Sequence, residues 1–249
     1  TVVTSGGTPY LSLNIGGTTV QANYASGSGS TALVFTYTIL AAQNDTDGIS
    51  VAANSLGLNS GTLRDAAGNA ATITSSAVAS NPAYLVDTTA PSVIITSDVT
   101  PLRAGETANI SFTFSEAPDA SFAWDGSAGD LSISGGTLSA ITGTGLTRTA
   151  VYTPTPSLAS GTGSISVTAN SYQDAAGNNG STGVSPNLSL DTLAPSIASL
   201  ALSSATGAVA SPLDATVKLL NTADTLCATV TFNEAVTLNT TAGSPTLAL

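Results

Sequence analysis

The sequence predicts an all-β protein made of antiparallel β-sandwiches arranged end to end. Apolar and polar residues alternate with a period of two in several short segments, which is the pattern of half-buried strands. Glycine and proline breakers separate these segments, and no stretch of the 249 residues keeps a helical apolar period. Longer strings also recur about one small domain apart, which indicates an array of similar modules.

The repeat is carried by two motifs that occur in the same order in each copy. Asp-Ala-Ala-Gly-Asn occupies residues 65–69 and 174–178, and Asp-Thr-x-Ala-Pro-Ser follows at residues 87–92 and 191–196. An Ile-Ser-Val segment precedes each Asp-Ala-Ala-Gly-Asn string. Each module therefore has about 100 residues, enough to bury a core without disulfide bonds.

The repeats predict where the modules begin and end. Residues 1–88 should be the C-terminal part of a module whose first strands are missing, 89–192 a complete module, and 193–249 the N-terminal part of the next. Residues 237–249 match residues 1–13 without a gap, so the first and third modules are of one kind. We expect a window from a continuous array. The alternative is that open ends of separate chains complete each other by strand addition, although the two matching segments would then compete for one strand position.

Alternation predicts the strands in chain order. It is clearest in Leu-Ser-Leu-Asn-Ile from residue 11, in the segment from residue 33 to 39, in Ile-Ser-Phe-Thr-Phe from residue 110 and in Ala-Thr-Val-Thr-Phe from residue 228. Threonine and serine fill the outward positions, where a sheet in water needs polar side chains that suit strands. Among the apolar residues, we expect Trp124 in the core, Tyr37 and Tyr152 in the core or at its rim, and Cys227 buried as a small hydrophobe.

Composition excludes several classes of function. Four Lys and Arg against fifteen Asp and Glu give a net charge of −11, which repels phosphate backbones and excludes nucleic acid as a partner. The sequence has no run of 18 apolar residues, so it does not predict membrane insertion in this segment. The chain has no His, and its serines have no partner that would make a nucleophile, while nothing sets the separation of Asp125 and Asp130. The sequence therefore does not predict an enzyme.

Acidic residues do recur where the modules should meet. In a seven-stranded sandwich the loops after the second and sixth strands return to the pole at which the chain enters. Asp87 in the preceding junction, Glu116 after the second strand, and Asp174 with Asn178 in the loop before the last strand should converge there. Carboxylates packed together repel one another, and a hard cation with oxygen ligands, most suitably calcium, would relieve this repulsion.

Four further residues carry the same motifs at the other junctions. Asp65 and Asn69 repeat the loop, Asp191 repeats the junction residue, and Glu234 repeats the residue after the second strand. The alternative is pure turn chemistry, because Asp can accept hydrogen bonds from the backbone and Gly and Asn tolerate positive φ. Residues 44–48 (Asn-Asp-Thr-Asp-Gly) resemble half of a calcium loop but lack the later ligands, so a solvated hairpin turn is favoured there.

These motifs resemble the tandem immunoglobulin-like (Ig-like) repeats of large bacterial surface adhesins exported by type I secretion, of the biofilm and extender-region type. The resemblance rests on Phe-Ser-Glu at residues 114–116, Phe-Asn-Glu at 232–234, and the two repeated strings, and it covers essentially the whole chain. It implies extracellular or cell-surface display and, in several branches, calcium at domain junctions. The expected function is a structural spacer or fibre segment whose partners are neighbouring Ig-like repeats. The alternative is an Ig-like module that recognises glycan or a host protein through its loops.

Overall fold

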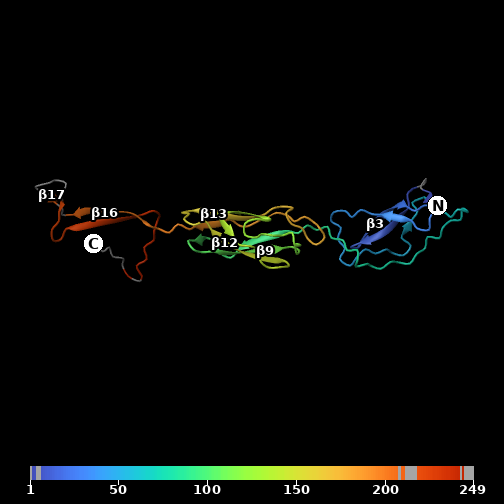
Figure 1. The fold of residues 1–249 in the computed structure, drawn as a ribbon, viewed down its shortest axis with the longest axis horizontal. Coiled ribbons are helices and arrows are strands. Elements are labelled where there is room, and N and C mark those ends of the chain that lie inside the picture. The colour runs from blue at the N-terminus through green and yellow to red at the C-terminus, as the bar shows by residue number, and fades with distance from the viewer. Residues whose placement is uncertain (1, 4–6, 207–208, 211–217, 242, 244–249) are drawn as a thin grey trace.

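The computed structural model describes residues 2–3, 7–206, 209–210, 218–241 and 243. Three β-rich units follow one another along a line, in chain order (Figure 1). Within the described residues there are strands and turns but no helix, and almost all strand pairs are antiparallel. The predicted fold class, all-β with antiparallel Ig-like sandwiches, is thus confirmed. The exact division into modules remains a prediction.

The N-terminal unit contains one four-stranded sheet and a short two-stranded ladder. The sheet has the order β4-β3-β2-β5, and β1 pairs with β6. Residues 16 and 17, both glycine, form the two-residue turn between β2 and β3, where positive φ at both positions suits a tight hairpin. The strands are β1 (Val2–Val3), β2 (Tyr10–Ile15), β3 (Thr18–Ser26), β4 (Val34–Thr36), β5 (Leu56–Gly57) and β6 (Thr62–Leu63).

The middle unit is a two-sheet sandwich. One sheet has the order β11-β12-β9-β7, and the other has the order β10-β13-β15-β8 with β14 paired to β13. The strands are β7 (Val93–Ser97), β8 (Leu102–Arg103), β9 (Ala108–Phe114), β10 (Leu131–Ser134), β11 (Gly136–Leu138), β12 (Thr147–Pro154), β13 (Gly161–Val167), β14 (Gly183–Val184) and β15 (Leu188–Asp191).

The sandwich core forms because alternate residues of both sheets point inward. In β9 the residues Ala108, Ile110, Phe112 and Phe114 are all buried, while those between them are more exposed. Every residue of the buried apolar cluster found among the described residues lies between Val93 and Leu190. The predicted strand from residue 110 is therefore confirmed, and the core holds the middle unit together by apolar burial.

Aromatic side chains fill the end of this core nearest the linker from the N-terminal unit, residues 87–92. Phe122 packs edge-to-face against Phe114, with ring centroids 4.8 Å apart, and against Tyr172 at 5.4 Å. Trp124 is half-buried and packs against the same cluster, so its expected core role is largely confirmed. Tyr152 is fully buried, and its hydroxyl donates to the Ser134 carbonyl.

The C-terminal unit is a long hairpin. Strand β16 (Ile197–Thr206) pairs with β19 (Thr225–Phe232), and β17 (Val209–Ala210) pairs with β18 (Lys218–Leu219). All residues of β19 are exposed. The expectation that Cys227 is buried is therefore wrong in this structure, because no second sheet among the described residues covers the hairpin. The last residues that match the N-terminus, 244–249, lie outside the described residues.

Two local features differ from expectation. Strand β15 pairs in parallel with β8, which lies at the edge of the sheet. Residues 44–48 are not a solvated hairpin turn, because Asp45 is buried and accepts hydrogen bonds from the backbone N–H groups of Gly16, Asp47 and Gly48. These bonds, led by that from Gly16, lower the pKa of Asp45.

Candidate metal centre

Three carboxylates meet where the N-terminal unit joins the middle sandwich. Asp87, Glu116 and Asp174 each place a carboxylate oxygen within 4.8 Å of the others. Asp87 lies on the linker, Glu116 follows β9 by two residues, and Asp174 lies between β13 and β14. The structure thus brings together the three acidic residues that the topological argument placed at this pole, and Asn178 lies beside them.

The Asp174 side chain is held by its own loop. Its Oδ1 accepts hydrogen bonds from the backbone N–H groups of Ala176 and Asn178, and its Oδ2 accepts from the Asn178 amide at 2.8 Å. Gly177, with φ of 89°, supplies the positive-φ position that closes the turn. Burial raises the pKa of Asp174, but the hydrogen bonds from Asn178 and the loop backbone outweigh it, so the pKa is lowered. These hydrogen bonds therefore favour the ionised form of the Asp174 carboxylate and fix its direction.

Glu116 has the opposite environment. Its Oε1 is buried without a hydrogen-bond partner. Burial raises the pKa of Glu116, and the neighbouring carboxylates of Asp87 and Asp174 raise it further. All charged groups that shift this pKa are thus negative, and a buried oxygen with no donor is the kind of atom that a cation or ordered water satisfies.

The linker that carries Asp87 is bonded on both sides. The Asn178 amide donates to the Asp87 carbonyl at 3.1 Å, which ties the linker to the middle sandwich. On the other side, Val86 and Asp45 exchange two backbone hydrogen bonds, and the Thr88 N–H donates to the Asn44 side chain at 2.8 Å. Asp87 therefore lies on a segment that both units contact.

Sequence reasoning missed one anchor of this linker. The Tyr172 hydroxyl donates to the Pro91 carbonyl at 3.2 Å, and the Ser181 N–H donates to the same oxygen at 2.9 Å. No repeat signal marks Tyr172, because Leu63 stands at the corresponding place before the first Asp-Ala-Ala-Gly-Asn string. Only the burial of Tyr172 beside the linker reveals its role.

The first copy of the loop repeats the geometry of the second. The Asn69 N–H and amide donate to the two carboxylate oxygens of Asp65, both at 2.8 Å. These bonds, led by that of the Asn69 side chain, lower the pKa of Asp65. The predicted turn chemistry is therefore present in both copies. Among the described residues, however, a group of three carboxylates is found at Asp87, Glu116 and Asp174 alone.

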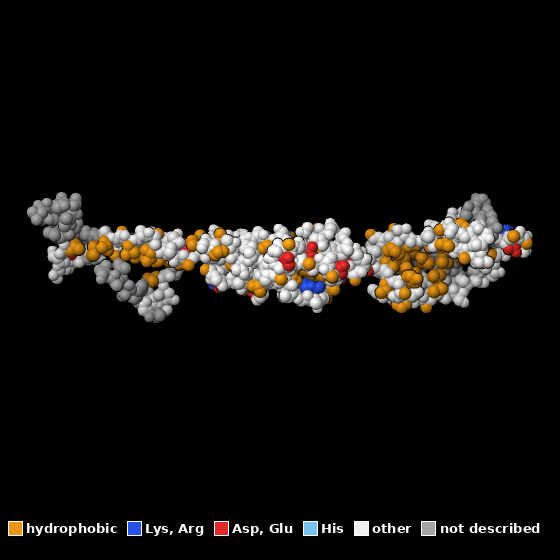
Figure 2. Space-filling view, viewed as in Figure 1, with side chains coloured by type: hydrophobic (Ala, Val, Ile, Leu, Met, Phe, Trp, Pro, Cys, Tyr) orange, Lys and Arg blue, Asp and Glu red, His pale blue; other side chains and the backbone are white. Residues whose placement is uncertain are grey.

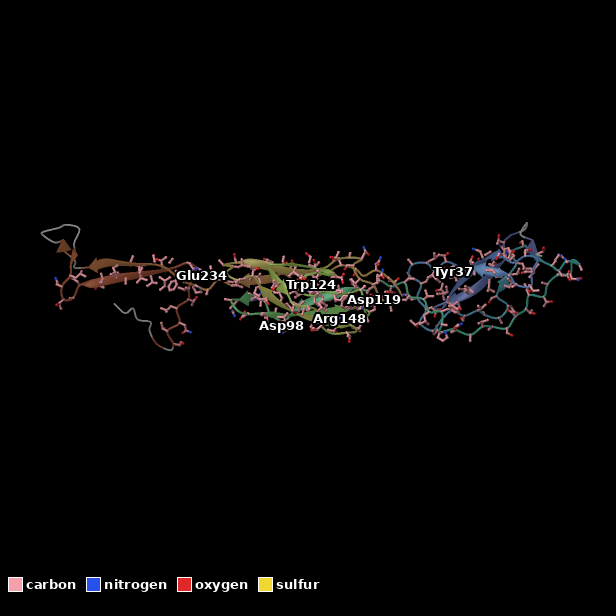
Figure 3. The ribbon with its side chains drawn as sticks, viewed as in Figure 1. Tyr37, Asp98, Asp119, Trp124, Arg148 and Glu234 are labelled. Atoms are coloured by element: carbon pink, nitrogen blue, oxygen red, sulfur yellow. The ribbon has the colours of Figure 1, made fainter. Side chains whose placement is uncertain are left out.

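The second junction holds two of the corresponding residues. Asp191 and Glu234 line one depression of 550 Å³ between the middle sandwich and the C-terminal hairpin. Glu234 lies at this boundary (Figure 3), and its Oε1 is also buried without a hydrogen-bond partner. Glu116 and Glu234 thus occupy equivalent positions, each at the end of a Phe-x-Glu motif, and each has a buried oxygen without a hydrogen-bond partner.

The other acidic pair considered from the sequence has a structural role. Asp125 accepts from the N–H groups of Ser127 and Ala128, and Asp130 accepts from the Ala123 N–H. These bonds close the loop around Trp124, whose indole N–H donates to the Leu138 carbonyl at 3.3 Å. Both carboxylates are occupied in shaping this loop.

One comparison with known proteins, that with protein-family models, agrees with the fold. Neither the curated proteins nor the solved structures gave a match to the chain. None of the described residues forms a helix of the length and apolarity needed to cross a membrane. Domains of the type matched by the family model are generally surface or extracellular modules with structural or binding roles, and are typically not enzymes. Residues 87–190, which include all the strands of the middle sandwich except the last residue of β15, match the family model described as bacterial Ig-like domain.

Proposed function

We propose that this chain is a structural repeat segment of an extracellular bacterial adhesin or fibre, and that it acts as a stiff spacer rigidified by calcium. The observation that carries this proposal is the meeting of Asp87, Glu116 and Asp174 within 4.8 Å at a junction between units. A spacer needs no catalytic group and no deep pocket. It does need joints that resist bending.

The spacing of the three carboxylates fits calcium. Two oxygens bound to one calcium ion at 2.3–2.6 Å can be at most about 5.2 Å apart, and magnesium at 2.0–2.1 Å allows only about 4.2 Å. The carboxylate oxygens of this group all lie within 4.8 Å of one another, which is inside the span that one calcium ion can bridge. Asp87, Glu116 and Asp174 would supply three ligands, and the Glu116 oxygen that has no donor would gain a partner. Waters and carbonyl oxygens complete such sites in flexible geometry.

An ion at this place would stiffen the joint through the linker. The linker is bonded to the N-terminal unit through Asn44 and Asp45 and to the middle sandwich through Asn178. Without a cation, the repulsion among three carboxylates opposes this arrangement. With a cation, Asp87 on the linker is held to Glu116 and Asp174 of the sandwich. Bending at the joint would then require breaking ion–oxygen contacts.

Calcium titration calorimetry and pulsed electron paramagnetic resonance test this proposal together. Spin labels at Thr19→Cys in β3 and Thr113→Cys in β9, in a Cys227→Ser background, occupy exposed strand positions in the two units. We expect calcium binding with heat, and a distance distribution at least twofold narrower than in EDTA. The proposal would be refuted if the width of the distance distribution were the same with and without calcium and no heat of binding were measured.

A further inference from the structure

Two strands each leave one edge unpaired among the described residues. Strand β4 ends the sheet order β4-β3-β2-β5 of the N-terminal unit, and β19 pairs with β16 alone. An open strand edge offers a row of unpaired N–H and C=O groups that another strand can pair with. Both edges are therefore available for pairing.

In the middle sandwich the strands that correspond to these two are neighbours. Phe-Asn-Glu at the end of β19 repeats Phe-Ser-Glu at the end of β9. Tyr37, just after β4, matches Tyr152 in β12. Strand β3 pairs with β4 as β11 pairs with β12. Strand β12 pairs antiparallel with β9, with Tyr152 opposite Ala108, Val151 opposite Asn109 and Ala150 opposite Ile110.

The faces next to these edges lack the cover that the middle sandwich has. Leu226, Val230 and Phe232 of β19 are 43%, 36% and 36% exposed, whereas the corresponding residues of β9 are at most 3% exposed. Phe35 and Tyr37 are only half-buried, whereas Tyr152 is fully buried. Figure 2 shows hydrophobic side chains gathered over the N-terminal unit and along the hairpin. Apolar surface of this kind marks an interface.

We propose that β19 of one copy of this sequence adds antiparallel to β4 of a second copy, in the register of β9 and β12. Tyr37 then lies opposite Leu226, Thr36 opposite Cys227, and Phe35 opposite Ala228. The hairpin of one copy and the sheet of the other then form one continuous sheet, with their apolar faces on the same side, as β9 and β12 do in the middle sandwich. The contact joins different surfaces, so it propagates head to tail.

The sequence identifies the occupant as a second copy of this chain. Residues 237–249, which come directly after the hairpin, match residues 1–13, with which the N-terminal unit begins. In the order of the sequence, a hairpin of this kind is thus succeeded by a sheet of the N-terminal kind. The second copy is a separate molecule of the same sequence. This inference does not depend on calcium.

Disulfide trapping tests the register, because the chain has a single cysteine, Cys227, and it is exposed. Unmodified protein is mixed with the double variant Thr36→Cys, Cys227→Ser and oxidised with glutathione disulfide in EDTA. Neither chain carries both cysteines, so a disulfide between Cys227 and the thiol introduced at position 36, found by mass spectrometry, must join two molecules. Directly opposite residues of antiparallel strands have Cα atoms about 4.5–5.5 Å apart, within the range for a disulfide.

Two matched controls shift the cysteine by two residues in either direction, within β4 or just after it. Val34→Cys and Thr38→Cys, each with Cys227→Ser, keep the same face but place the thiol two residues out of register, at more than about 7 Å. We expect at least tenfold more linked peptide for position 36 than for either control. Equal yields at the three positions would overturn the proposal.

A measurement without substitutions guards against a variant that does not fold. Sedimentation velocity of the unmodified chain should show species at twice the 24.3 kDa of one chain and above, increasing with concentration. A single species of 24.3 kDa at several hundred micromolar would also overturn the proposal. Calcium binding to an unassociated chain would leave the proposed ion site standing, so the two proposals fail separately.

Discussion

Replacing Glu116 by glutamine should remove most of the stabilisation by calcium. A ligand that binds the folded state alone adds RT ln(1 + [L]/Kd), which is about 2.7 kcal/mol at a hundredfold excess over Kd. For a sandwich of about 100 residues, each kcal/mol shifts Tm by about 4–8 °C. Calcium should therefore raise the Tm of the unmodified chain by about 10–20 °C under these conditions.

The variant separates the effect of the ion from that of the repulsion. In EDTA, burial and the carboxylates of Asp87 and Asp174 disfavour the ionised form of Glu116. Because a glutamine amide carries no negative charge, Glu116→Gln removes this repulsion and should raise Tm in EDTA. Adding calcium should raise the Tm of Glu116→Gln by only a small part of the increase expected for the unmodified chain. Differential scanning calorimetry in calcium and in EDTA measures both effects.

Glu106→Gln is the matched control for this experiment. Glu106 is a partly exposed glutamate of the same sandwich, and its Oε1 lies 3.7 Å from Nη1 of Arg103. It does not belong to the group formed by Asp87, Glu116 and Asp174. Its replacement should leave the calcium increment unchanged within about 1 °C, because exposed ion pairs contribute little. An equal increment in Glu116→Gln and Glu106→Gln, or none in the unmodified chain, would refute the reasoning.

Three further predictions concern stability and the linker. Phe122→Ala should cost about 3–5 kcal/mol in urea unfolding of the middle sandwich with an unchanged m-value, because Phe122 packs against three other rings. The hydrogen bonds from Asn109 lower the pKa of Asp98, so their stabilisation is present above about pH 4 and lost as the pH falls through that lowered pKa. The stability gap between unmodified protein and Asp98→Asn should accordingly shrink in acid, and a constant gap would contradict this assignment. Asn178→Ala removes the bond to the Asp87 carbonyl, so amide exchange of the linker should accelerate, whereas unchanged exchange would show that Pro91 and its partners suffice.

The sequence predicted those features that depend on local pattern and repetition. Alternation placed the inward residues of β9, and the paired motifs placed Asp87, Glu116 and Asp174 at one pole, since strand direction alone fixes which loops share an end. It did not predict the burial of Asp45, because the donors from Gly16 and Gly48 approach it only after the unit has folded. The exposure of Cys227 was missed for a related reason, because burial of a strand depends on what covers it.

The path of the chain through the middle sandwich determines how it bears tension. The linker enters at one end of the unit and β15 leaves at the other, with strands running along the long axis (Figure 1). A pull on both ends draws β7 and β15 in opposite directions along their lengths. The bonds of β7 to β9, and of β15 to β13 and β8, are then loaded in shear, so each row must yield together rather than bond by bond. Such a module would hold a load in series with its neighbours.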